Sequence, residues 1–195
     1  MAGRRRRREA AAERPPPDGD AAMEIAVHFL GSRPRTRWEL QRRLRRAGAS
    51  DEVIDATMAR LARLGYVDDI AFARWWAEQR DRHAPRGRRL VEAELRQRGV
   101  PREVLERLRE EESPAADETH GLPSTDAERA QVALTRHLRG RPLPDDRQAL
   151  QRLGQFLIRR GFDPETARAA IRVAAAESTP GGSTGDPDGM DGTDG

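Results

Sequence analysis

Three stretches of eleven residues in this chain align with one another without a gap. They read LRRAGASDEVI at 44–54, LRQRGVPREVL at 95–105 and LIRRGFDPETA at 157–167. In each, a leucine stands four residues before a glycine, and a serine, proline or aspartate stands two residues after it. This pattern predicts a helix that ends at the glycine and another that begins two or three residues later. Because so small a unit cannot bury a thick core alone, tandem copies are expected to stack.

The remaining sequence is typical of helices, since it is rich in Ala, Leu, Arg, Glu and Gln and poor in β-branched residues. Thr36 with Glu39, and Thr125 with Glu128, form the pattern of a helix-starting capping box. We therefore predict an all-α fold, three tandem three-helix repeats that form an elongated, curved array. The predicted helices cover residues 21–30, 36–47, 51–64, 69–83, 87–98, 102–111, 126–139, 146–160 and 164–176.

Composition divides the chain into three repeats and three segments without apolar periodicity. The segments at both ends are too polar to offset the entropy of ordering them, so both are predicted to be disordered. The predicted boundaries are an Arg/Pro-rich arm at 1–19, repeat 1 at 20–64, repeat 2 at 65–111, an acidic linker at 112–125, repeat 3 at 126–178 and an acidic tail at 179–195.

The charge of the chain is concentrated in its helical part. All 36 basic residues are arginines, and with 33 acidic residues the formal net charge is +3. Counted by segment, residues 20–109 carry a net charge of +6 and residues 126–178 one of +3, whereas the linker and the tail are acidic. This distribution predicts a local basic surface and an anionic partner.

Several classes of protein are excluded by what the sequence lacks. There is no cysteine, which excludes a disulfide scaffold and a thiolate site and fits the reducing cytoplasm. No run of 18 apolar residues exists, so no membrane partner is expected, and no apolar segment follows the arginines at 4–8 as a secretory signal would require. The four histidines show no ligand spacing, and no phosphate-binding glycine loop or nucleophile elbow occurs. We predict no enzyme, no cofactor and no metal site.

Arginines cluster on the second helix of each repeat and at its start. The clusters are Arg35, Arg37, Arg42, Arg43, Arg45 and Arg46; then Arg82, Arg86, Arg88, Arg89, Arg96 and Arg98; then, more thinly, Arg152, Arg159 and Arg160. Because stacked repeats place equivalent helices in register, these clusters predict a basic stripe for phosphate or carboxylate groups. The alternative is a solvated face balanced by acids one turn away, such as Glu92 beside Arg88 and Arg96. Our candidate partner-binding or DNA-binding residues are Arg35, Arg37, Arg42, Arg43, Arg46, Arg86, Arg88, Arg89 and Arg96.

The segment that joins repeats 1 and 2 has a structural interpretation. Gly65 fits the end of a helix, Tyr66 a half-buried packing residue, and Asp68 the N-cap of the next helix. Asp68 and Asp69 could form a paired-carboxylate metal site, but only the distant His83 could add a ligand, so we reject that alternative.

Three aromatic residues, Phe72, Trp75 and Trp76, fall on one face of the following helix. We interpret them as core packing between repeats 1 and 2, with base stacking on single-stranded nucleic acid as the alternative. Since adjacent residues of a helix diverge by about 100°, at most one of the two tryptophans is expected to be fully buried.

Four motifs, taken in order, resemble one known family. RTRWEL at 35–40, GYVDDIAFARWWAEQR at 65–80, GRRLVEAELRQRGV at 87–100 and RRGF at 159–162 are similar to the motifs of the RecX family, bacterial regulators of the RecA recombinase. Two departures are a longer acidic insert before the third repeat and a more diverged third repeat, with Ala167 where the first has Ile54.

The resemblance implies a cytoplasmic regulator, expected to be a monomer, rather than an enzyme. Such a protein would lie in the helical groove of the RecA–DNA filament, bridge neighbouring subunits, and inhibit ATP hydrolysis, strand exchange and coprotease activity. Two alternatives remain open: a DNA-binding protein that places helix–turn–helix elements in the major groove, and an adaptor for some other acidic protein.

Overall fold

The computed structural model describes residues 15–111 and 125–178, and within these ranges it contains nine α-helices and no strand. The helices are α2 (Gly19–Leu30), α3 (Arg37–Arg46), α4 (Asp51–Arg63), α5 (Asp69–His83), α6 (Arg88–Gln97), α7 (Arg102–Glu111), α8 (Asp126–Leu138), α9 (Arg147–Arg159) and α10 (Pro164–Ser178). The all-α prediction is confirmed, and each predicted helix is present with ends within about two residues. The disorder predicted for the two ends falls on residues 1–14 and 179–195, and the predicted acidic linker on residues 112–124, all outside the described residues.

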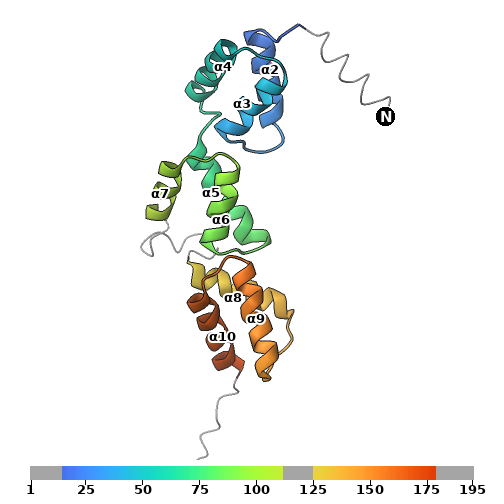
Figure 1. Ribbon diagram of the computed structural model, residues 1–195, viewed down its shortest axis with the longest axis vertical. Helices are drawn as coiled ribbons and strands as arrows, with labels where there is room; N and C mark the ends of the chain where they lie inside the picture. The colour runs from blue at the N-terminus through green and yellow to red at the C-terminus, as the bar shows by residue number, and fades with distance from the viewer. Residues whose placement is uncertain (1–14, 112–124, 179–195) are drawn as a thin grey trace, which may run out of the picture.

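Three helical units follow one another along the longest axis of the molecule (Figure 1). Helix α2 packs against α3 and α4, α5 against α6 and α7, and α10 against α8 and α9. Each unit has a separate cluster of buried apolar residues. The predicted tandem array of three-helix repeats is therefore confirmed. No helix in the described ranges is long and apolar enough to cross a membrane.

The same buried pair anchors the middle helix of each unit. Leu40 and Leu44 of α3 are fully buried, and the residues at the same places are Val91 and Leu95 in α6 and Leu153 and Leu157 in α9, all of them buried. The spacing of four residues puts each pair on one helix face. The capping predictions are also confirmed, because the hydroxyls of Thr36 and Thr125 each accept a hydrogen bond three residues on and the partner glutamates return it.

Two details of the first unit differ from the prediction. Helix α2 begins at Gly19, inside the stretch predicted to be disordered, because the Asp18 carboxylate caps it by accepting from the Ala21 N–H at 2.9 Å. The prediction that Tyr66 is half-buried is wrong, since its side chain is 58% exposed. Its backbone N–H instead donates to the Leu61 carbonyl at 3.0 Å, so it is the backbone of Tyr66 that helps to end α4.

The aromatic residues of α5 form the core of the second unit itself. Phe72 and Trp76 are buried and Trp75 is half-buried, as expected for adjacent tryptophans. Their apolar partners, among them Leu95 of α6 and Leu105 of α7, belong to the same unit. The prediction that these rings pack between the first and second units is therefore wrong in its location. The burial of Phe72 leaves its ring no face for a base.

The three aligned glycines end their helices with a positive φ, between 77° and 89°. At Gly48 an added Cβ would meet no atom within 4 Å. At Gly99 it would lie 2.4 Å from both Cβ and Cγ of Trp38 in the preceding unit. The glycine of the second unit therefore permits close contact between units, in addition to allowing the turn.

These two glycines form a matched test. Gly48→Ala should lower the free energy of unfolding by about 1 kcal/mol, because alanine is strained in the left-handed conformation. Gly99→Ala should lower it by about 3 kcal/mol or more, because the methyl group also collides with Trp38. Urea denaturation of both variants measures the difference, and equal losses would mean that the contact with Trp38 stabilises nothing.

Candidate partner-binding surface and the joints beneath it

The joint between the first two units is built at the start of α3. The Thr36 hydroxyl, which caps α3, also donates to the Arg98 carbonyl at 2.7 Å, next to the glycine turn of the second unit. One residue later, the Arg37 N–H donates to Asp69 Oδ1 at 2.9 Å. Asp69 is the first residue of α5, which follows the Asp68 cap. Burial raises the pKa of Asp69 above its usual value, although the hydrogen bond and the charge of Arg37 oppose that shift.

The joint between the second and third units uses equivalent positions. Gly87, which aligns with the threonine of the first joint, donates its N–H to the Arg160 carbonyl at 2.9 Å. The Arg88 N–H donates to Asp126 Oδ1 at 3.0 Å and Oδ2 at 3.1 Å, and Asp126 is the first residue of α8. A Cβ on Gly87 would lie 2.3 Å from the Gly161 carbonyl oxygen, so the two backbones touch. The second joint thus repeats the first, except that the backbone N–H of Gly87 donates where the hydroxyl of Thr36 does in the first.

A buried ion pair strengthens the second joint. Arg129 Nε donates to Asp81 Oδ1 at 3.0 Å, and each side chain is only 7% exposed. Arg136 Nη1 also donates to the Arg82 carbonyl at 3.1 Å, at the C-terminal end of α5. Since a buried charge is costly without its partner, this pair requires the two units to stay together.

Glu39 links arginines on both sides of the first joint. Its Oε1 lies 2.9 Å from Arg33 Nη2 and 2.9 Å from Arg98 Nη1. Burial alone would raise the pKa of Glu39, but the hydrogen bond and charge of Arg33, with the Thr36 N–H and Arg98, hold it below the usual range. The Arg98 guanidinium also lies 3.8 Å from the ring centroid of Trp76. Arg98, predicted to belong to the basic stripe, is a joint residue.

Glu94 and Glu92 gather other arginines of the second unit. Glu94 Oε2 accepts from Trp76 Nε1 and Arg80 Nε, both at 2.8 Å, and its other oxygen pairs with Arg86. Burial, with Arg80 and Arg160 nearby, lowers the pKa of Arg86.

Glu92 is buried on the same helix and accepts from Arg96 Nη2 at 2.8 Å and Arg109 Nε at 2.5 Å. The hydrogen bond from Arg109 is the main reason that the pKa of Glu92 lies below its usual value. The charges of Arg109, Arg96 and Arg88 add to the effect, and burial opposes it.

Four of the nine candidate arginines are held by contacts within the protein. Arg35 Nε donates to the Phe29 carbonyl at 3.2 Å, and its guanidinium lies 3.9 Å from the centroid of the Phe29 ring. Arg96 and Arg86 pair with the glutamates of α6, and Arg88 is half-buried against the third unit. Of these four, only Arg96 pairs with an acid one turn away, as the alternative of a balanced face describes; the other three are held by a backbone carbonyl and a ring, by a more distant glutamate, or through the backbone.

The other five candidates point away from the core of α3 and α6. Arg37, Arg42, Arg46 and Arg89 are exposed, and Arg43 is half-buried. Arg42 lies over the ring of Trp38, 4.9 Å from its centroid. Within residues 15–111 and 125–178, no carboxylate lies within 4.0 Å of these five guanidinium groups. These arginines are available to an anionic partner.

All three helical units match models of one protein family. Residues 22–61, 68–107 and 124–171 match the first, second and third three-helix domains of RecX, in that order. The chain belongs to the RecX family. The regulatory protein RecX of Mycolicibacterium vanbaalenii is 34% identical over 164 residues, which are 81% of this chain and 84% of that protein. RecX of Thermobifida fusca is 37% identical over 153 residues, 77% of each chain.

A solved structure shows the same fold. The crystal structure of RecX from Lactobacillus salivarius superposes with a TM-score of 0.66 at 16% sequence identity, and the match covers 82% of this chain and 97% of that one. The three matched RecX domains coincide with α2–α4, α5–α7 and α8–α10. The third unit, whose sequence has diverged most from the repeat, is therefore a RecX domain like the others.

Sequence reasoning missed the acidic residues that organise the arginines of these RecX domains. Glu39 was recognised only as half of a capping box, and Asp81 and Glu94 were not singled out. A signal was present, because Glu39 is the one acid in the otherwise basic α3. An acid next to a buried core position in an arginine-rich helix indicates an internal ion pair rather than a solvated charge.

The low pKa of Glu92 predicts how RecX stability depends on pH. Because the folded pKa lies below the usual 4.5, the stabilisation by Glu92 is complete above that pH and is lost as the pH falls through the folded pKa. The free energy of unfolding of the native protein should therefore fall more steeply below about pH 4.5 than that of Glu92→Gln. Urea titrations along a pH series test this, with Glu103→Gln, at an exposed position of α7, as control. Parallel curves for native protein and Glu92→Gln would contradict it.

Proposed function

We propose that this RecX-family chain regulates a RecA-type recombinase by binding along the groove of its nucleoprotein filament. There it bridges neighbouring subunits and inhibits ATP hydrolysis, strand exchange and coprotease activity. The observation that carries the proposal is the match of all three RecX domains to three units stacked in line. The relatives are named regulatory proteins, and the proposed role is binding rather than catalysis.

The shape of the molecule supports binding to a repetitive partner. The two joints use equivalent positions, so each unit presents equivalent helices to the outside. A filament likewise repeats the same protein surface and the same DNA phosphates along its length. A stack of units can therefore contact several filament subunits at once, and linked contacts raise the effective affinity far above that of one.

The exposed arginines supply the chemistry for an anionic partner. Arg42 and Arg46 on α3 and Arg89 on α6 are exposed on the middle helices of two successive units. A guanidinium group binds phosphate or carboxylate with two parallel hydrogen bonds, so these side chains suit both DNA and acidic protein surface. A filament groove offers both. Action on this filament places the protein in the cytoplasm, where we propose that it works as a monomer.

Direct reading of duplex DNA by helix–turn–helix elements is the second candidate, and the packing argues against it. The Gly99 turn lies against Trp38, and the Gly161 turn lies against Leu90 of the unit before it. Recognition helices begin directly after such turns. Two of the three turns would have to leave the preceding unit before their helices could enter a major groove.

A titration of filament ATPase tests the proposed function. Purified protein added to a preformed RecA filament on single-stranded DNA with ATP should reduce the rate of hydrolysis in proportion to its occupancy. No change at micromolar protein would contradict the proposal. Binding to naked duplex with a defined sequence preference, measured by selection, would favour the second candidate instead.

Charge reversal separates the proposed face from charge in general. Arg42→Glu with Arg89→Glu should raise the concentration for half-inhibition by about tenfold or more, since each lost contact is charge-assisted. The matched control is Arg63→Glu with Arg107→Glu, at exposed positions of α4 and α7. It makes the same change in net charge and should shift the curve little. Equal shifts would contradict a role for this face.

A further inference from the structure

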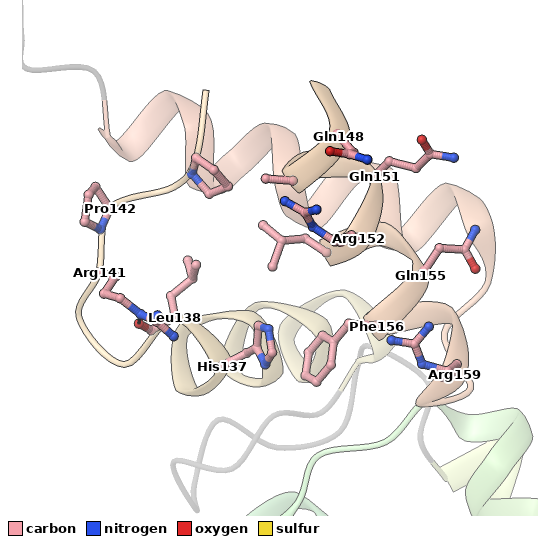
Figure 2. A pocket seen from close by; sticks show the side chains of 13 residues that line it. His137, Leu138, Arg141, Pro142, Gln148, Gln151, Arg152, Gln155, Phe156 and Arg159 are labelled. Carbon is pink, nitrogen blue, oxygen red and sulfur yellow. Dashed lines mark hydrogen bonds between the residues drawn. The ribbon is translucent and has the colours of Figure 1, made fainter. Parts of the chain in front are cut away.

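The third unit contains a hollow that the preceding proposal does not use. It lies between the C-terminal turn of α8, the α8–α9 loop and one side of α9, and its volume is about 810 Å³ (Figure 2). A smaller hollow of about 280 Å³ adjoins it and shares His137, Arg141 and Phe156 with it. The smaller hollow is also lined by His83, Ala84 and Pro85 of the second unit, so the two together form a depression that runs from the third unit to its joint with the second, large enough for an extended ligand.

The lining of this depression is basic and contains no acidic residue. Its arginines are Arg136, Arg139, Arg141, Arg152, Arg159 and Arg160. Unlike Arg86 and Arg96, Arg152 and Arg159 have no carboxylate within 4.0 Å among the described residues, and both are exposed. Three glutamines of α9, at 148, 151 and 155, add groups that donate and accept hydrogen bonds.

The pKa of His137 is affected by these arginines. Its pKa is lowered first by burial and then by the charges of Arg141, Arg160 and Arg139. Burial and the positive surroundings thus both favour the neutral imidazole. It stacks on Phe156 with 3.9 Å between ring centroids and 26° between ring planes.

We propose that this depression binds a short stretch of single-stranded nucleic acid. Arg152 and Arg159 lie on the same face of α9, about two turns apart, and bind phosphates of one strand, while a base stacks on the exposed face of His137. A groove of positive charge with an aromatic platform is how proteins hold single strands without reading sequence. An acidic peptide would use the arginines alone and leave the ring pair without a role, so the nucleic acid is the better fit.

The assignment deepens the proposed function, because it gives the third unit a contact with the strand inside the filament. It is tested without any recombinase, so that the two can fail separately. The probe is a fluorescein-labelled oligothymidylate, and its anisotropy is followed as this protein alone is added at several salt concentrations.

Two double variants with equal loss of charge distinguish the site from the rest of the unit. Arg152→Ala with Arg159→Ala should weaken binding about tenfold or more. It should also make the slope of log K against log salt shallower by about 1.4, the value for two single-strand phosphate contacts. Arg168→Ala with Arg172→Ala, at exposed positions of α10, should change affinity less than twofold. His137→Ala should weaken binding about fivefold or more without changing the slope.

Three results would overturn the assignment. The first is no binding of the oligonucleotide by the native protein at low salt. The second is equal loss in the two double variants, which would mean general attraction. The third is displacement of the oligonucleotide by polyglutamate as readily as by unlabelled strand, which would make the depression a site for acidic protein. Any of these with filament ATPase inhibition intact would remove the nucleic-acid site and leave the proposed function standing.

Discussion

Close backbone contact at the glycine turns is the constraint on which this structure depends. The turns at Gly99 and Gly161 each present the carbonyl just before the glycine to the preceding unit, where Thr36 or Gly87 donates to it. A side chain in place of Gly99 would push the units apart. The three cores are separate, so the units are held in line mainly by these joints and by the ion pairs around them. The units are therefore joined by backbone contacts and buried charge rather than by one shared core.

Many arginines near the first joint and in the second unit form ion pairs within the protein. Glu39, Glu92 and Glu94 each hold two arginines, whereas Arg37, Arg42 and Arg46 of α3 and Arg89 of α6 stay exposed. The arginines around the α8–α9 depression lack such acidic partners among its lining residues. The arginines therefore fall into two groups. Many in the middle of the molecule form internal ion pairs, and others are exposed and available to a partner.

The sequence predicted what is local and missed what is distant. The helices, the capping boxes and the buried Leu40–Leu44 pattern follow from spacings of three or four residues, which is why they could be predicted. The contacts of Arg98 with Glu39 and of Arg129 with Asp81 join residues 59 and 48 positions apart, and no local pattern encodes them. For the same reason the sequence could not show which candidate arginines are paired and which are exposed, because some of their partners lie far along the chain. Tyr66 was misjudged because its hydroxyphenyl ring suggested packing, whereas the turn uses its backbone.

The joint has a polarity, because the start of the middle helix in one unit meets the glycine turn of the next. An association of two unlike surfaces has no built-in stopping point, and repeating one such step generates a screw. The direction and pitch of that screw are set by the few atoms at Thr36, Gly87 and their acceptors. A partner that is itself helical can then be followed only as far as the two pitches stay commensurate.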